Sequence, residues 1–324
     1  MKNNPILIVL GEPNSIFSEI LIKTIKKKII HKLNKPIIII GSVNLFKAQI
    51  KLLGYSLKFK IINKDNLKEL KNKNIYFIDI KYDFRKAFDK ISKKSNSYIN
   101  SSFQIAFKLL RQKYASGMIN GPISKKHFLI KKHLGITEFI SKKIKSKKKP
   151  TMLIYNSKFS VCPVTTHLPI NRVAKNLTKK KIINDILNIF NFYEKTLKRN
   201  PKIAVLGLNP HCETVDIVSE EQKVINPSIK YLKKKKIKIA GPFSADTFFS
   251  NENLKKYDVA VGMYHDQVLT PMKTLFKFDA INLTLGLPFF RVSPDHGINY
   301  LMIGKKKSKP DSLISCINFL RKVQ

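Results

Sequence analysis

The sequence predicts an α/β protein, and two features of the 324-residue chain lead to this prediction. Short apolar runs rich in Ile and Val recur along the whole length, and each ends in a Gly, Pro or polar cluster. Longer segments with helical patterns separate these runs. Apolar runs of this kind indicate strands buried on both faces, as in a mainly parallel sheet covered by helices. The alternation of strand and helix over the full chain is typical of α/β architecture.

The strands are predicted in order from the apolar runs themselves. The first four cover 6–10, 36–40, 75–80 and 117–119. Six more cover 152–155, 159–164, 203–206, 237–240, 259–263 and 280–285. Helices are predicted over 101–112, 171–198, 220–235 and 310–322. No linker rich in Pro, Gly or Ser interrupts the series, so a domain boundary would be a crossing of the sheet rather than a tether.

The composition is strongly basic: 62 Lys and Arg residues against 21 Asp and Glu residues give a net charge of +41. Such a field attracts polyanions, so a nucleic-acid-binding protein is one alternative. Lysine, however, is spread over many separate segments, and no helix-turn-helix, zinc-finger or aromatic RNA-binding signature accompanies it. We therefore interpret the charge as a compositional bias and expect no specific nucleic-acid partner.

The cysteines and the apolar runs indicate the cellular compartment of the protein. Cys162, Cys212 and Cys316 are far apart and lack CxxC spacing, which indicates reduced thiols in a cytoplasmic protein. The apolar run 6–10 is too short for a signal-peptide core, and no stretch of about 18 apolar residues could cross a membrane. We therefore expect a cytoplasmic protein without a membrane partner.

Three of the predicted strands end in polar loops that carry a histidine, namely His167, His211 and His265. In open α/β sheets the ligand binds beyond the carboxyl ends of the strands, so these imidazoles are expected at one edge of the sheet. Taken singly, each could be an ordinary hydrogen-bonded loop histidine. Three converging neutral imidazoles leave positions for water or substrate, which is the arrangement of a catalytic divalent-metal site.

Four other polar residues stand at comparable places. Lys273 follows His265 by eight residues and could reach back toward it, and Asp246 could orient a histidine ligand. Asn282 lies within an apolar strand, where a buried amide needs a purpose, and Arg291 offers a fork for a carboxylate or phosphate. Neither a GxGxxG nor a Walker A sequence is present. The residues alone therefore predict an α/β enzyme with a metal site.

A series of motifs resembles 4-hydroxythreonine-4-phosphate dehydrogenases, a family of vitamin B6 biosynthesis. The motifs keep the family's order and spacing from residue 6 to about residue 320. They are Gly11-Glu12-Pro13, Asn120-Gly121-Pro122-Ile123-Ser124-Lys125, Gly135-Ile136-Thr137-Glu138-Phe139, Thr165-Thr166-His167-Leu168-Pro169, Gly207-Leu208-Asn209-Pro210-His211, Gly241-Pro242 with Ala245-Asp246-Thr247, Tyr264-His265-Asp266-Gln267, Asn282-Leu283-Thr284-Leu285-Gly286-Leu287-Pro288-Phe289, Arg291 and Asp295-His296-Gly297.

The resemblance implies a fold like that of isocitrate and isopropylmalate dehydrogenases, with two α/β subdomains and a cleft between them. The first subdomain would comprise residues 1–128 plus 285–324, and the second residues 129–284 with the dimer interface. The resemblance also implies a homodimer whose active site is shared between the subunits. One divalent metal per site (Zn, Mg or Co) would be held by His167, His211 and His265.

The implied reaction is the NAD- or NADP-dependent oxidation of a small phosphorylated amino acid, 4-phosphooxy-L-threonine. Its product, 2-amino-3-oxo-4-phosphooxybutanoate, would lose carbon dioxide to give 3-amino-2-oxopropyl phosphate on the way to pyridoxal 5'-phosphate. A metal would activate the alcohol and polarise the ketone. Four residues match the family's substrate-binding positions, and two are catalytic candidates. They are Thr137, Lys273, Asn282 and Arg291 for substrate, and Lys273 and Asp246 for catalysis.

Two departures from the family pattern keep alternatives open. Ile136 stands where the family usually has a histidine that contacts substrate, and Ser124 replaces another usual histidine. One alternative is a related dehydrogenase of another phosphorylated four-carbon hydroxy acid, such as phospho-threonate or phospho-erythronate. A second is an acyltransferase of the phosphotransacetylase type, which has a similar fold and needs no three-histidine metal site.

Overall fold

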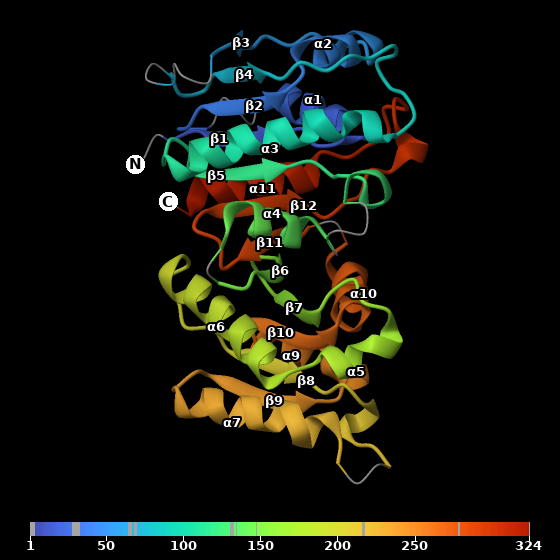
Figure 1. The fold of residues 1–324 in the computed structure, drawn as a ribbon. Helices are drawn as coiled ribbons and strands as arrows, with labels where there is room; N and C mark the ends of the chain where they lie inside the picture. Colours follow the sequence, from blue (N-terminus) through green and yellow to red (C-terminus); the bar gives the residue numbers. More distant parts are fainter. Residues whose placement is uncertain are drawn as a thin grey trace. The chain divides into compact units, whose positions relative to one another are not determined.

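The computed structural model describes residues 4–27, 33–63, 67, 70–129, 133, 135–146, 148–215, 218–277 and 279–323. The chain divides into two compact units, whose elements are labelled in Figure 1. Unit 1 comprises Met1–Ile136 and Pro288–Gln324, and unit 2 comprises Thr137–Leu287. The sequence-based boundaries, after residues 128 and 284, lie somewhat earlier in the chain.

Unit 1 is built on parallel strands. Their spatial order is β3 (Lys60–Ile61), β4 (Ile75–Asp79), β2 (Ile37–Gly41), β1 (Ile6–Val9), β5 (Gly117–Asn120) and β12 (Phe290–Pro294). The central strands β1, β2 and β5 are buried along their whole length, as their unbroken apolar sequences predict. The sequence reading missed β3 and β12, because β3 has only two paired residues and β12 carries Arg291 and Ser293 among its apolar residues.

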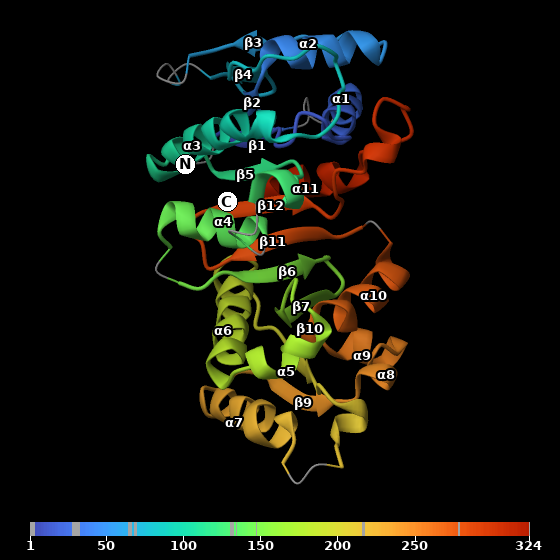
Figure 2. The same cartoon turned by 45° about the vertical axis from the view of Figure 1, so that its right-hand side comes forward.

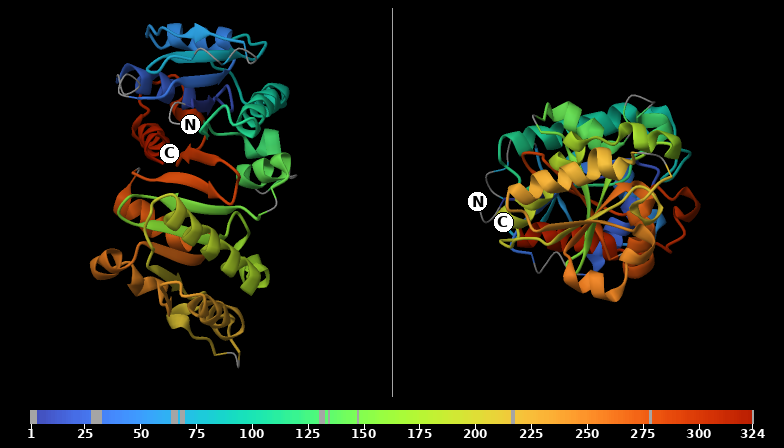
Figure 3. Two further views of the ribbon diagram at one scale, coloured as in Figure 1. Left: turned by 90° about the vertical axis from the view of Figure 1, so that its left-hand side faces the viewer. Right: turned by 90° about the horizontal axis from the view of Figure 1, so that it is seen from below.

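Helices cover both faces of the unit 1 sheet. Figure 3 shows α3 on one face, with α1 and α11 on the other. Each helix has an apolar side that packs on the strands; α3, for example, buries Ile99, Phe103 and Phe107, which lie one turn apart. The helices are α1 (Phe17–Lys26), α2 (Val43–Leu52), α3 (Asn96–Arg111) and α11 (Asp311–Lys322), with shorter helical segments at Lys93–Ser95, Lys125–Leu129 and Tyr300–Met302.

The sheet of unit 2 is mixed. Its strands, in spatial order, are β11 (Ile281–Leu285), β6 (Thr151–Tyr155), β7 (Ser160–Thr165), β10 (Val259–Tyr264), β8 (Ile203–Leu206) and β9 (Ile239–Phe243). From β7 to β9 neighbouring strands are parallel, whereas β6 runs antiparallel to both β7 and β11. The prediction of a mainly parallel sheet therefore holds for four of these strands and misses the reversal at β6.

Unit 2 also has helices on both faces of its sheet. Figure 2 shows α6 on the opposite face from α10, and α7 lies beside α6. None of the helices within the described residues is both long enough and apolar enough to cross a membrane. The helices are α4 (Ile136–Ile144), α5 (Val173–Asn176), α6 (Lys179–Lys195), α7 (Asn226–Lys234), α8 (Ala245–Phe248), α9 (Asn251–Lys256) and α10 (His265–Phe276), with shorter segments at Ile170–Arg172, Pro210–Cys212 and Glu221–Ile225.

The single helix predicted over 171–198 is two helices, and a cap explains the break. Leu177 has an extended backbone, which ends α5. Thr178 is also extended, and its hydroxyl accepts a hydrogen bond from the backbone N–H of Lys181. A threonine that caps the first turn in this way starts a new helix. The boundary between α5 and α6 therefore lies within a stretch whose apolar periodicity is continuous.

Several helices end with the backbone in the left-handed region. At the end of α2 this residue is Gly54, with φ +70, and the next residue donates to the carbonyl of Ile50. The same hydrogen-bonding pattern ends α3, α4 and α7, but there the left-handed residues are lysines: Lys113, Lys145 and Lys236. Glycine is the usual residue at this position because it has no Cβ to crowd the carbonyl.

A buried carboxyl group lies between α6 and the unit 2 sheet. Asp185 is 4% exposed, and its Oδ1 accepts a hydrogen bond of 2.5 Å from the Thr151 hydroxyl. The amide of Asn188 also donates to that hydroxyl at 2.9 Å. Burial raises the pKa of Asp185 from its ordinary value of 3.8 to about 6, although the Thr151 hydrogen bond and the charge of Lys181 act in the opposite direction. Burial therefore keeps this carboxyl group protonated to a higher pH than an ordinary aspartate.

We predict that Asp185 makes unit 2 less stable as the pH rises from about 4 to about 6. Because the folded state binds the proton more tightly than the unfolded state, stability is greatest below the unfolded pKa and falls until the folded pKa is passed. The rise in the pKa of Asp185 from 3.8 to about 6 corresponds to about 3 kcal/mol of unfolding free energy. Urea unfolding at pH 4 to 7 should show a flatter profile for Asp185→Asn than for the unaltered chain. Substitution of the exposed Asp83 by Asn is the control, and equal profiles for the Asp185 variant and the unaltered chain would contradict the prediction.

Candidate functional site

The three candidate histidines follow the carboxyl ends of three neighbouring strands of unit 2. His167 lies two residues beyond β7, His265 begins α10 directly after β10, and His211 lies in the short helical segment after β8. In the sheet, β10 lies between β7 and β8 and is parallel to both. The strands therefore present the three histidines at one edge of the sheet, as expected from the sequence.

His167 and His265 lie beside each other. Their ring centroids are 5.6 Å apart, with the ring planes inclined by 36°. The Nδ1 of His265 is 3.2 Å from the carboxylate of Asp266, which is a common way to fix the orientation of a ligand imidazole. Two neutral imidazoles at this separation have the donor chemistry of a zinc-type divalent-metal site.

His211 is paired differently. Its Nδ1 lies 3.9 Å from Oδ2 of Asp246, and both side chains are largely exposed. His211 and the following Cys212 both have positive φ, at 54° and 63°, which is a strained conformation for residues other than glycine. Within the described part of the chain, no group of three or more His, Cys, Asp or Glu residues is placed to hold a metal ion. One chain therefore brings together two of the predicted ligands, not all three.

Asp246 is the carboxylate paired with His211. The Ser244 hydroxyl donates a 2.5 Å hydrogen bond to its Oδ1. That hydrogen bond, together with the neighbouring His211, holds the pKa of Asp246 below its ordinary value. Asp246 is therefore an ionised group that can orient the His211 ring, which is the part the sequence analysis suggested for it.

A cavity of about 570 Å³ opens beside His211 and Asp246. It is the size of a small-molecule site and combines apolar walls with a few polar groups. Its lining comes from the ends of β8, β9 and β10 and from α5. The lining residues are Ile170, Val173, Ala174, Leu208, Asn209, Pro210, His211, Ser244, Ala245, Asp246, Tyr264 and Gln267.

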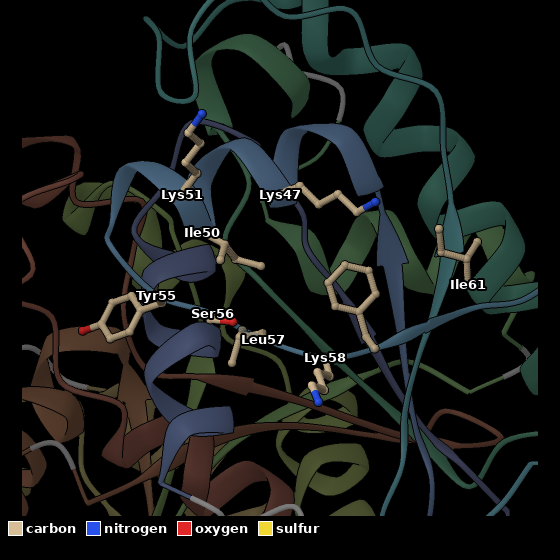
Figure 4. Close-up of a pocket in the computed structure, with 9 residues that line it drawn as sticks. Lys47, Ile50, Lys51, Tyr55, Ser56, Leu57, Lys58 and Ile61 are labelled. Atoms are coloured by element: carbon tan, nitrogen blue, oxygen red, sulfur yellow. The ribbon is translucent and has the colours of Figure 1, made fainter.

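A second cavity, of about 490 Å³, lies in unit 1 between α2 and the segment that follows it. Figure 4 shows that the amines of Lys47, Lys51 and Lys58 extend in different directions from its rim rather than toward a common point. It contains none of the residues predicted from the sequence.

The predicted substrate residues of unit 2 are spread over three elements. Thr137 lies near the start of α4, and its hydroxyl is 3.5 Å from that of Thr284 on β11. Asn282, also on β11, has a buried Oδ1 with no hydrogen-bond partner among the described residues. A buried amide oxygen of this kind is what a ligand donor would satisfy. Lys273 is exposed in the last turn of α10, about 12 Å of helix rise from His265.

Arg291 belongs to unit 1. It lies on β12 rather than in a loop, is 1% exposed, and its Nε donates to Oδ1 of Asn120 at 2.7 Å. Arg291 is predicted from the sequence to offer a fork for a carboxylate or phosphate, and its guanidinium is buried and hydrogen-bonded within unit 1.

Two residues near the histidines were not among the sequence candidates. Gln267 lies two residues after His265 in the motif Tyr264-His265-Asp266-Gln267. Glu221 is 2% exposed, and burial by itself would raise its pKa. Hydrogen bonds from Asn209 and Leu208 outweigh burial and lower the pKa, so Glu221 is a buried carboxylate beside the His211 loop. An acidic pair at 220 and 221 at the start of a predicted helix was the available signal.

Comparisons with known proteins agree with the motifs. A family model described as pyridoxal phosphate biosynthetic protein PdxA matches residues 32–320. The chain is 37% identical over 314 residues to 4-hydroxythreonine-4-phosphate dehydrogenase of Sulfurihydrogenibium sp. (strain YO3AOP1). The matched region covers 96% of this chain and 95% of that relative. The solved structure of 4-hydroxythreonine-4-phosphate dehydrogenase from Klebsiella pneumoniae has a TM-score of 0.83, with 23% identity and 99% of each chain covered.

The predicted fold class is confirmed as well. The solved structure of an isocitrate dehydrogenase from Methylococcus capsulatus has a TM-score of 0.52 with 8% identity, over 98% of this chain and 85% of that one. That likeness concerns the fold alone. The family model and the relative at 37% identity both span most of the chain. The chain therefore belongs to the PdxA family of pyridoxal phosphate biosynthetic proteins.

Proposed function

We propose that this protein is an NAD(P)-dependent, divalent-metal-dependent 4-hydroxythreonine-4-phosphate dehydrogenase that works as a cytoplasmic homodimer. It oxidises 4-phosphooxy-L-threonine with NAD or NADP to 2-amino-3-oxo-4-phosphooxybutanoate, releasing the reduced cofactor and a proton. Loss of carbon dioxide then gives 3-amino-2-oxopropyl phosphate. The dehydrogenase name of its relatives supports the use of a nicotinamide cofactor as hydride acceptor.

The pairing of His167 with His265 is the observation that carries the proposal. Two imidazoles 5.6 Å apart at the strand ends fit a divalent cation, and Zn, Mg and Co remain the candidates. His211 lies with Asp246 instead, and a homodimer supplies a reason. In the proposed assembly, His167, His211 and His265 from two chains complete each metal site. The exposed Ile170 and Val215, close in sequence to His167 and His211, are apolar surface that such an interface would bury.

When bound, the metal would lower the pKa of the substrate alcohol and polarise the resulting ketone. The side chains of the chain would then position the substrate and move its proton. Lys273 would stabilise or relay the hydroxyl proton, and Asp246 would hold the orientation of His211. Thr137 and the unpartnered Oδ1 of Asn282 would bind polar groups of the substrate. Arg291 would bind an anionic end of the substrate through its guanidinium group.

Ile136 favours a second candidate, a dehydrogenase of phospho-threonate or phospho-erythronate. It is half-buried at the first position of α4, next to Thr137, and its side chain offers no hydrogen bond to a substrate. The other departure, Ser124, has a local role, because its hydroxyl accepts a 3.1 Å hydrogen bond from the backbone N–H of His127.

The test is to follow NADH or NADPH formation with each of the three phosphorylated substrates, after adding Zn, Mg or Co to metal-free protein. We expect turnover of 4-phosphooxy-L-threonine that is lost on chelation and restored by metal. Faster turnover of one of the other acids would replace the proposed substrate and keep the proposed chemistry. Acyl transfer to phosphate that persists after chelation would instead support the acyltransferase alternative.

A further inference from the structure

We propose that Gln267 and Glu221 are positioning residues that fix the His211 loop against the strand end from which His265 emerges. This inference deepens the proposed function and rests on it, because it concerns how the chain holds one of the three proposed metal ligands. The two side chains act at opposite ends of the same short segment, residues 207–209.

Gln267 joins the ends of β8 and β10. The Cα pairing of these strands is regular from Val259 with Ile203 to Val261 with Val205, and no further pairing extends it. Beyond that point the Gln267 side chain connects the two strands by hydrogen bonds. Its Nε2 donates to the carbonyl of Gly207 at 2.7 Å, and its Oε1 accepts from the backbone N–H of Met263 at 2.6 Å. One amide thus satisfies a carbonyl of the β8 end and an N–H of β10, as a ladder pair would.

Glu221 holds the next two residues of the segment. Its Oε1 accepts from the backbone N–H groups of Leu208 at 2.7 Å and Asn209 at 2.9 Å. Its Oε2 accepts from the Asn209 side-chain amide, which also donates to Glu220, both at 2.9 Å. Hydrogen bonds to an ionised acceptor are the stronger kind, and this acceptor is almost fully buried. Both backbone donors that precede Pro210 are therefore bound by one carboxylate.

The fit around Gly207 adds a steric restraint. A Cβ on this residue would lie 2.6 Å from Sγ of Cys212 and 3.1 Å from Oε1 of Glu221. Gly207, at the start of the loop, is therefore packed against Cys212 at its end and against the buried carboxylate of Glu221. The N–H of Gly207 also donates to the carbonyl of Phe243 on β9 at 2.9 Å, which attaches the same residue to the opposite neighbouring strand.

These restraints matter because the loop they hold is strained. His211 and Cys212 keep positive φ without being glycine, a state that persists only where the surroundings fix it. His211 itself is exposed, so its own packing does not fix it. The hydrogen bonds at 207–209 hold the backbone from which His211 projects, and the Asp246 carboxylate lies where it can orient the ring itself. A ligand held in advance by such a supporting shell binds metal more tightly than one on a free loop.

The test uses Glu221→Gln and Gln267→Met in the full-length protein, with Co²⁺ as the probe. We expect both variants to bind Co²⁺ about 10- to 100-fold more weakly, measured by competition with a chromophoric chelator. In the metal-free protein, amide hydrogen exchange at Leu208 and Asn209 should be faster in Glu221→Gln than in the unaltered chain. Gln267→Glu, which keeps the acceptor for Met263 and loses the donor to Gly207, is the second variant should Gln267→Met not fold.

Tyr193→Phe is the matched control. It removes another buried hydrogen bond of unit 2, from the Tyr193 hydroxyl to Ser160 at 3.0 Å, at the amino end of β7. It should leave Co²⁺ affinity unchanged, and an equal loss in this control would show that general destabilisation explains the effect and would overturn the inference. Unchanged Co²⁺ affinity in the Glu221 and Gln267 variants would also overturn it. If the unaltered protein binds no Co²⁺, the proposed function fails instead, whereas faster exchange at Leu208 would still support the bracing of the loop.

Discussion

Replacement of His265 by Ala is expected to lower kcat/KM by about 10³-fold or more and to abolish tight metal binding. A Lewis-acid metal contributes several kcal/mol of transition-state stabilisation, and about 4 kcal/mol corresponds to three orders of magnitude in rate. Removing one of two adjacent imidazoles leaves His167 without the neighbour whose ring lies 5.6 Å away. The measurements are metal content after dialysis and initial rates of NAD(P)H formation.

The control for this substitution is His127→Ala, in a helical segment of unit 1 that is not among the candidate ligands. It should retain both metal and activity. The circular dichroism spectrum of His265→Ala should match that of the unaltered protein, because the residue begins α10 and its side chain is partly exposed rather than in the core. Full activity and metal content in His265→Ala would refute the assignment of the metal site to these histidines.

Replacement of Gly241 by Ala is expected to destabilise unit 2 by about 3 kcal/mol or more. Gly241 has φ +127, a region that side chains other than glycine rarely adopt, and its new Cβ would collide with the carbonyl oxygen of Val205 on β8. Backbone strain contributes about 1–3 kcal/mol, and the collision with a fixed backbone atom adds to it. The melting temperature should fall by about 10 °C. Differential scanning calorimetry or thermal circular dichroism would measure the change.

Gly297→Ala provides the comparison for Gly241→Ala. A Cβ at residue 297 would meet no heavy atom within 4 Å, so the melting temperature should stay the same within about 1 °C. The contrast separates local geometry from the general cost of replacing glycine. A Gly241→Ala protein as stable as the unaltered chain would show that β8 and β9 can move apart without loss.

The elements that the sequence predicted well are those whose residues are apolar throughout. Strands such as β1 and β2 are buried on both faces, so their sequences are unbroken runs of Ile, Leu and Val. The predicted helix over 171–198 was wrong because apolar spacing continues across Leu177 and Thr178, and only the cap at Thr178 reveals the break. The reversed direction of β6 was beyond prediction, because strand direction depends on pairing and leaves no mark on composition.

For the site, the sequence predicted which strand ends carry the histidines but not how they associate. The position of His211 in a loop after a strand predicts the end of the sheet at which it lies. Which side chain His211 pairs with depends instead on the conformation of that loop, which has two positive φ angles and hydrogen bonds to Glu221 and Gln267. None of these contacts has a sequence spacing that identifies it. The burial of Arg291 was missed for a related reason, since β12 itself had not been recognised.

The left-handed lysines at the ends of α3, α4 and α7 place part of the positive charge of the chain at helix C-termini. The backbone at these three helix ends has the same conformation and hydrogen bonds as at the end of α2, where the left-handed residue is glycine. Only the residue type is unusual. In this chain, which has 12 glycines and 62 basic residues, lysine stands at helix ends where other proteins usually have glycine. Each such lysine also places a positive charge near the negative end of the helix dipole, which stabilises the helix. Three of the 62 basic residues therefore end helices at a position where glycine is usual.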